Sequence, residues 1–131
     1  MEILAQLSRE HEILRTHLER IESAAAACNA DELRACLYAA RDALNDELDA
    51  HIATEEAEAF SAIAETMGDG LLTPFYDEHV EIRALRDDIY SQLARGEAPY
   101  SLCLRLCDLI LAHQQREDMM LFPSAREALA H

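Results

Sequence analysis

Apolar residues recur at intervals of three and four along most of the chain, the spacing that places them on one face of an α-helix. In the first segment this face holds Leu14, Leu18 and Ile21, and near the end of the chain it holds Leu102 and Leu106. The chain is also rich in Ala, Leu, Glu and Arg, which are strong helix formers. The pattern therefore predicts an all-α protein.

Glycine and proline, with only three of each in the chain, mark where the predicted helices begin and end. Asn29 followed by Glu32 has the spacing of a capping box, and Pro123 is expected to end the last long helix. Short connections make consecutive helices antiparallel, so we expect an up-down-up-down four-helix bundle with a short C-terminal helix. The long helices are predicted over residues 2–27, 29–59 with a broken continuation to 66, 73–95 and 99–122, and the short one ends at Leu129.

One short group of residues occurs twice in this pattern: a lone His, then His-x3-Glu on the next helix, with a Phe nine residues after the second His. An acid four residues after a His is common in so acidic a chain. The chain has only three Phe, however, so a Phe at a given offset is roughly a 1-in-40 event. The recurring Phe is therefore the informative part. The two copies are His11, His51, Glu55 and Phe60, and His79, His113, Glu117 and Phe122.

The helical rise of about 1.5 Å per residue puts His11 and His51 roughly 27 and 33 Å from the predicted turn near residue 29. His79 and His113 lie roughly 27 and 24 Å from the turn near residue 97, so all four are expected in one layer. Each i,i+4 glutamate shares a helix face with its histidine. Any one such histidine by itself is typical of a half-buried residue that is hydrogen-bonded to a neighbouring Glu. Four imidazoles and two carboxylates that converge from four helices instead indicate a dinuclear metal site with bridging carboxylates.

The composition of the chain limits its domain number, its possible partners and its location. With 131 residues, half of them hydrophobic, the chain is expected to form one domain over residues 1–131. A net charge of −15 without any Lys argues against a nucleic-acid or anionic-membrane partner. The sequence has neither a signal-peptide pattern nor an apolar run of about 18 residues, so we expect a cytoplasmic protein that is not inserted in a membrane.

We do not expect the four cysteines to form a disulfide framework, because a chain with this much apolar content does not need disulfides. Cys103 and Cys107 lie one helical turn apart and are interpreted as small buried hydrophobic residues. The sequence assigns no role to Cys28 or Cys36.

Over essentially its full length the chain resembles the hemerythrin-like (HHE cation-binding) domain family. The resemblance implies an antiparallel four-helix bundle that holds two iron ions with an oxo or hydroxo bridge, and dioxygen, nitric oxide or peroxide as the small-molecule ligand. It also implies that the six His and Glu residues of the two copies are the metal ligands. Mn and Zn also accept such ligands, so the sequence does not identify the metal. The segments that carry the resemblance are His11–Arg15, His51–Phe60, Glu78-His79 and His113–Pro123.

The chain departs from the oxygen-carrying hemerythrins at two places. Their third helix supplies His-x3-His, whereas Arg83 stands four residues after His79 here, so the resemblance favours sensing or detoxification over oxygen transport. An open coordination position is expected near Arg83. The oxygen carriers also use His-x4-Asp on the last helix, a spacing that His113 and Asp118 fit. We expect Glu117 to be the ligand, because position i+5 turns about 140° away from the histidine, and Asp118 is the alternative.

Two acidic residues next to the ligand histidines, Glu10 and Glu78, have two open interpretations. Each either orients a ligand histidine or lies on a solvated helix face.

Three functional hypotheses follow from the sequence. The first is a di-iron protein that binds or reduces a small oxidant in sensing or stress protection. The second is a metal-binding or iron-handling module without turnover, and the third is a purely structural helical bundle. The sequence decides neither whether the protein is an enzyme nor which protein redox partner it has.

Overall fold

The all-α prediction is confirmed in a computed structural model that describes residues 2–130, in which the described residues form no strand. Three short π-helical segments, labelled η, interrupt the α-helices. The elements are α1 (Glu2–Ala26), α2 (Ala30–Ala39), η1 (Ala43–Glu47), α3 (Leu48–Thr54), η2 (Glu55–Phe60), α4 (Ser61–Met67), α5 (Thr73–Ala94), α6 (Tyr100–Arg116), η3 (Glu117–Leu121) and α7 (Phe122–Leu129).

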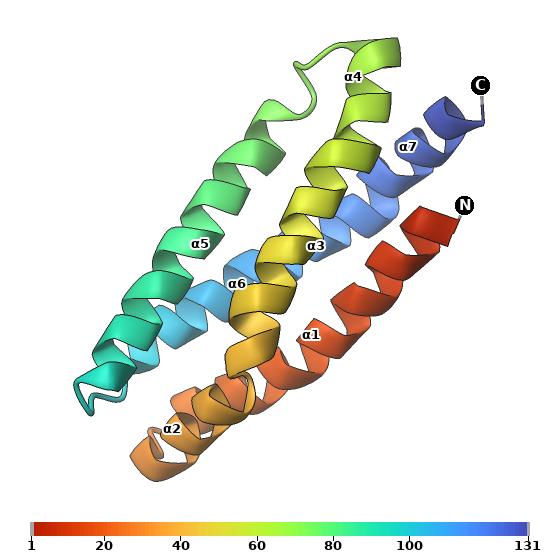
Figure 1. Cartoon of the computed structure of the whole chain (residues 1–131). Helices are drawn as coiled ribbons and strands as arrows, with labels where there is room; N and C mark the ends of the chain where they lie inside the picture. The colour runs from red at the N-terminus through yellow and green to blue at the C-terminus, as the bar shows by residue number, and fades with distance from the viewer. Residues whose placement is uncertain (1, 131) are drawn as a thin grey trace.

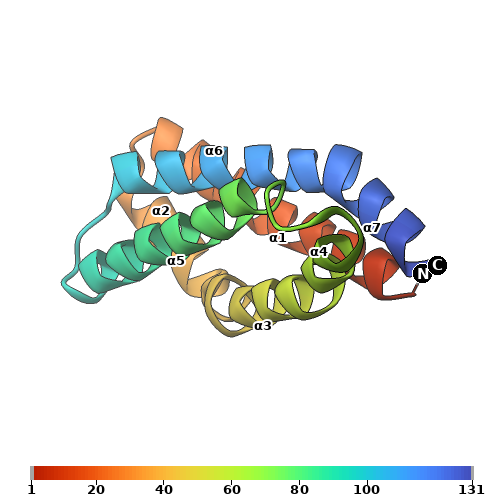
Figure 2. The same ribbon diagram turned by 90° about the horizontal axis from the view of Figure 1, so that it is seen from above.

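The elements form four antiparallel rods that run along the length of the molecule (Figure 1). The first rod is α1, the second runs from α2 to α4, the third is α5, and the fourth runs from α6 to α7. The chain descends along α1, returns along α3 and α4, descends along α5 and returns along α6 and α7, so its two ends lie at the same end of the bundle. Seen from above, α6 runs along one side of the bundle, and α3 and α4 run along the other (Figure 2). Helix α1 packs against α2 and α6, α5 packs against α6, and α4 packs against α7.

The second rod bends at a place that the sequence did not predict. The expected break lay between residues 59 and 66, but Phe60 has helical dihedral angles (φ −67°, ψ −40°) and the chain passes from η2 into α4 without a break. The bend instead follows α2, at Ala40 (φ −90°, ψ 3°). Helix α2 begins as predicted, with the backbone N–H of Glu32 donating to Asn29 Oδ1 at 3.1 Å.

Proline 123 is accommodated without a break in the last rod. Leu121 and Phe122 both have helical dihedral angles, and Pro123 lies in the first turn of α7, directly after η3. A first-turn residue needs no intrahelical N–H bond, so proline is tolerated there. The widened π turn therefore lets the rod continue as α7, the expected short C-terminal helix.

Two apolar clusters fill the bundle on either side of a layer of polar residues. The larger cluster surrounds Leu18, Leu37 and Ile89, whereas the smaller one surrounds Leu7 and Phe60 at the end where the chain termini lie. Burying polar side chains between such clusters costs free energy unless they find partners. The partners in this layer are therefore the key to its chemistry.

The buried cysteines belong to the larger cluster. Cys103 and Cys107 are both fully buried, and burial raises the pKa of each thiol to about 12. At neutral pH both are therefore protonated and act as small apolar side chains, as interpreted from the sequence.

Candidate metal centre

The structure brings the six predicted His and Glu side chains together in the polar layer. All six are buried, and even the most exposed of them, His51, is only 8% accessible. Both glutamates stand at the first position of a π-helical segment, a kind of local distortion that is frequent at functional sites. The six are His11 on α1, His51 on α3, Glu55 at the start of η2, His79 on α5, His113 on α6 and Glu117 at the start of η3.

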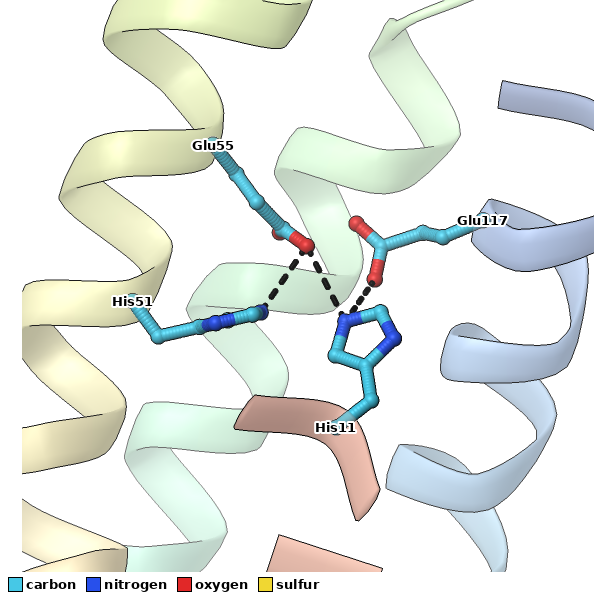
Figure 3. A group of neighbouring side chains, drawn as sticks. All are labelled: His11, His51, Glu55 and Glu117. Carbon is cyan, nitrogen blue, oxygen red and sulfur yellow. Dashed lines mark hydrogen bonds and ion pairs between the residues drawn. The ribbon is translucent and has the colours of Figure 1, made fainter. Parts of the chain in front are cut away.

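The side chains form two groups that share both glutamates. In each group the four ligand atoms lie within 4.8 Å of one another. The first group is drawn in Figure 3, where the two carboxylates reach in from opposite sides of the bundle toward the imidazoles. The groups are His11, His51, Glu55 and Glu117, and His79, His113, Glu55 and Glu117.

Glu55 turns one carboxylate oxygen toward each group. Its Oε2 lies 3.3 Å from His11 Nε2 and 3.0 Å from His51 Nε2, while its Oε1 lies 3.0 Å from His79 Nε2. One carboxylate can therefore place an oxygen on each of two neighbouring cations.

Glu117 repeats this arrangement from the opposite rod. Its Oε1 lies 3.2 Å from His11 Nε2, and its Oε2 lies 3.2 Å from His113 Nε2 and 4.0 Å from His79 Nε2. The two carboxylates thus span both groups, which is the geometry expected of ligands that bridge two ions.

The other ring nitrogen of each histidine contacts a carboxylate from a different rod. An ionised carboxylate only accepts hydrogen bonds, so each Nδ1–H donates and each Nε2 faces the site. A metal bound there would take the Nε2 lone pair, as a metal-binding histidine requires. Without a metal, Nε2–H of His11, His51 and His79 donates to Glu55 instead. The four contacts are His11 with Asp118 at 3.1 Å, His51 with Glu10 at 2.7 Å, His79 with Glu56 at 2.7 Å and His113 with Glu78 at 2.6 Å.

These contacts resolve the open interpretations of the flanking acids. Glu10 and Glu78 each orient the histidine on a neighbouring rod, not the histidine next to them in sequence. Asp118, the alternative ligand, lies outside both groups and holds His11 Nδ1 instead. Sequence reasoning missed Glu56, although the pairs Glu55-Glu56 and Glu117-Asp118 occupy matching positions of the two copies.

Electrostatics shows how poorly the layer suits a protein without cations. Burial raises the pKa of Glu55, but hydrogen bonds from His11, His51 and His79 outweigh it and hold the pKa well below its usual range. Burial and the nearby charge of Glu55 raise the pKa of Glu117 well above its usual range. Two carboxylates so close together cannot both ionise easily unless positive charge lies between them.

The buried atoms fit a metal pair. Within the described residues, both carboxylate oxygens of Glu117 and His113 Nε2 make no hydrogen bond of good geometry, although Glu117 Oε2 lies 3.2 Å from His113 Nε2. Ligand atoms about 2.1 Å from one ion and at right angles lie about 3.0 Å from each other, close to the separations found here. Imidazole and carboxylate are ligands that iron, manganese and zinc all accept.

The two recurring phenylalanines cover the site across the copies. Phe60 of the first copy stacks on His79 of the second, with ring centroids 5.4 Å apart and planes at 4°. Phe122 of the second copy stacks on His11 of the first, at 5.4 Å and 17°. Both rings are buried in the smaller apolar cluster, so they seal that side of the layer.

A surface pocket of about 310 Å³ reaches the site beside the first group, between α1 and the η1–α3 segment. A small cavity of about 10 Å³, with room for roughly one water molecule, lies among the six side chains. His11, Leu14, Leu48 and His51 line both spaces, so the pocket adjoins the cavity. Half-buried Arg83 lines neither space.

Comparison with known proteins gives one match. A family model described as Hemerythrin HHE cation binding domain matches residues 2–125. Neither the curated proteins nor the solved structures contain a match to the chain. Among the described residues, no helix combines the length and the apolar character that crossing a membrane requires.

Proposed function

Because the chain belongs to the hemerythrin HHE cation-binding family, we propose that it is a non-haem di-iron protein that binds or reacts with a small oxidant. The oxidant class is dioxygen, peroxide or nitric oxide, and the role is sensing or stress protection. The observation that carries this proposal is the pair of buried glutamates, each of which turns one oxygen toward each pair of histidines.

The residues that would hold the first iron are His11 and His51, those that would hold the second are His79 and His113, and Glu55 and Glu117 would be shared by both ions. An iron pair bound there would supply two redox equivalents and a position for a small ligand. The protein orients each imidazole through its Nδ1 carboxylate partner, which also makes the ring a stronger donor. Phe60 and Phe122 keep water away from the buried side of the layer.

Sensing or detoxification is favoured over oxygen transport by Arg83. It stands four residues after His79, where the oxygen carriers that the chain resembles have a further histidine ligand. A centre with one imidazole fewer has one more position at which a ligand can react. The pocket beside His11 and His51 provides a route by which a small molecule reaches the centre.

A second candidate is a metal-binding or iron-handling module without turnover. It is favoured by the small volume among the six side chains, about 10 Å³, which leaves little room for a substrate beyond the ions and one small group. In this function the metal itself, not an oxidant, is what the protein responds to.

Metal analysis and rapid mixing test both candidates. Protein purified from its host is expected to contain two irons per chain and to show the charge-transfer bands of an oxo-bridged diferric pair. His51→Ala and His113→Ala are expected to lower the iron content, whereas His17→Ala, at a half-buried histidine outside the site, leaves it unchanged. Less than one bound metal per chain in all four proteins contradicts both candidates.

Stopped-flow mixing of the diferrous protein with dioxygen, peroxide or nitric oxide then separates the two functions. Binding or consumption of one of these molecules supports the oxidant function. A diferrous centre that remains unchanged with all three supports the iron-handling module.

A further inference from the structure

Gln114 is a polar residue in the apolar floor of the site. It follows His113 on α6, is only 2% exposed and lines the small cavity among the proposed ligands. Apart from the six proposed ligands, every other residue that lines this cavity is aliphatic. These aliphatic residues are Leu14, Leu48, Ile52, Ile82 and Ile110.

The Gln114 side-chain oxygen has no hydrogen-bond partner within the described part of the chain. Its Oε1 atom is fully buried, and such an unpaired amide oxygen is costly because it has lost its hydration without replacement. Buried polar groups of this kind are rare in folded proteins and call for a specific explanation.

Packing does not explain the glutamine. The corresponding position in the first copy of the repeat, directly after His51, is Ile52, which is also 2% exposed and lines the same cavity. The fold thus accepts an aliphatic side chain at this place in one half of the bundle. A glutamine in the other half adds hydrogen-bonding capacity exactly where a molecule that entered the cavity would lie.

We propose that Gln114 is a ligand-binding residue that hydrogen-bonds the small molecule taken up by the metal centre, an inference that rests on the proposed function. A side-chain amide offers either its C=O or its N–H₂, because the two differ by a half-turn. It therefore favours molecules that accept or donate hydrogen bonds, such as azide or peroxide, over a weakly polar diatomic such as nitric oxide.

Azide and nitric oxide are the two probes that test this role, on the diferric and the diferrous protein respectively. Gln114→Met has nearly the same shape without the amide. It is expected to weaken azide binding about tenfold, the loss typical of one hydrogen bond to a charged group. Nitric oxide affinity is expected to change less than twofold. The antisymmetric stretch of bound azide is expected to shift in infrared spectra, which a purely structural role of the amide would not produce.

Gln115→Met is the matched control, because Gln115 is the neighbouring glutamine and is exposed. It is expected to leave both affinities and the azide stretch unchanged. Melting of the metal-free proteins provides a readout independent of metal: Gln114→Met is expected to melt no lower than wild type, because it removes an unpaired buried amide. Gln114→Leu repeats the test if the methionine variant does not fold.

The outcomes separate the two proposals. If wild type binds azide and the folded Gln114 variants bind it equally well, the role of Gln114 is wrong and the proposed function stands. Equal losses of azide and nitric oxide affinity also overturn the role, because they indicate a general disturbance of the centre. A wild-type protein that holds two irons and takes up neither azide nor nitric oxide overturns this inference. The oxidant function is overturned only if dioxygen and peroxide also leave the diferrous centre unchanged.

Discussion

The two halves of the proposed centre have the same internal geometry and different surroundings. The imidazole centroids lie 4.8 Å apart both in the His11–His51 pair and in the His79–His113 pair. In each half both Nδ1 atoms contact carboxylates from other rods, and one ring stacks on a phenylalanine of the opposite copy. The likeness follows the repeat in the sequence.

The difference lies in what covers each half. Phe75 lies edge-on to His113 at 5.6 Å, the Arg116 guanidinium lies 5.8 Å from the Phe75 ring, and Arg116 is paired with Glu78. The matching positions of the first copy hold Leu7 and Thr54, which carry neither an aromatic ring nor a charge.

The first half instead adjoins the 310 Å³ pocket. The repeat supplies the ligands, and the unrepeated neighbours decide which half a small molecule can reach.

The largest loss of metal affinity is expected from changing a residue that both halves share. Glu55 contacts histidines of both halves, so Glu55→Ala is expected to lower metal affinity more than the roughly 100-fold that loss of an outer hydrogen-bond partner can cause. Metal content measured after dialysis is expected to fall from two ions per chain to less than one.

The control is Glu58→Ala, at an exposed glutamate in the same π-helical segment, which is expected to retain both ions. A Glu55→Ala protein that keeps one tightly bound ion would show that the halves bind metal independently.

The next effect compares the acids that orient one histidine in each half. Glu78→Gln and Glu10→Gln are both expected to lower metal affinity, within the roughly 10- to 100-fold range of such partners. The loss is expected to be larger at Glu78, because its side chain is 17% exposed against 37% for Glu10 and it also holds Arg116. The rate of metal loss to a chelator measures this difference.

Glu81→Gln, at an exposed residue of α5, serves as the reference for a lost surface charge. Equal rates of metal loss in the Glu78 and Glu10 variants would show that the deeper burial of Glu78 and its contact with Arg116 do not strengthen the hold on His113.

The third prediction concerns the rate at which a small molecule reaches the metal centre, which is expected to differ about tenfold between variants that block the first half and the second half. Ala50 lines the pocket of the first half, and Ala112 is the exposed alanine at the matching position of the second copy. Ala50→Phe fills part of the pocket and is expected to slow azide association about tenfold, because entry must await side-chain motion. Ala112→Phe is expected to leave the rate unchanged, and stopped-flow absorbance distinguishes the two. A slower rate in the Ala112 variant alone would place the entry route on the second half.

The smallest expected effect is on the stability of the fold in acid, through the ion pair between Glu78 and Arg116 beside His113. Burial raises the pKa of Glu78, but hydrogen bonds from Arg116 and His113 outweigh it and hold the pKa below its usual value of 4.5. A lowered pKa stabilises the fold above the unfolded-state pKa, and this stability is lost as the pH falls through the folded-state pKa. In the metal-free protein, Glu78→Gln is expected to cost about 1 kcal/mol near neutral pH and progressively less as the pH falls below 4.5 through the folded-state pKa.

Urea unfolding of wild type and variant across this pH range measures the difference, with Glu81→Gln again as the surface reference. A cost that does not change with pH would mean that the charge of Glu78 does not contribute to stability.

Several features of the fold and the site follow from spacing alone. Intervals of three and four predicted the helices, and the spacing of Asn29 and Glu32 predicted the start of α2. The positions of the histidines relative to two turns predicted a common layer, and the structure places the four in one buried layer. Such predictions succeed because helical rise and rotation depend on residue number alone.

The spacing of residues along the sequence did not predict the contacts between rods. The bend at Ala40 lies near a buried arginine, Arg86 on α5, which donates to Leu44 O at 3.2 Å and pairs with Asp49. No local pattern marks Arg86 as buried, because two of its three partners, Leu44 and Asp49, are about 40 residues away in sequence and only Asp87 is adjacent. The position of the pocket likewise depends on the different side chains that cover the two halves.

The sequence by itself determined the helical class, the repeated His, Glu and Phe positions and the common height of the histidines, because these depend on distances counted along one chain. Only the tertiary structure decided that Glu10 orients His51 and that Phe60 stacks on His79. It also decided that Gln114 lines the cavity of the site and that the surface pocket adjoins His11 and His51. Each of these depends on how far the rods rotate and tilt against one another, and packing between rods sets those angles.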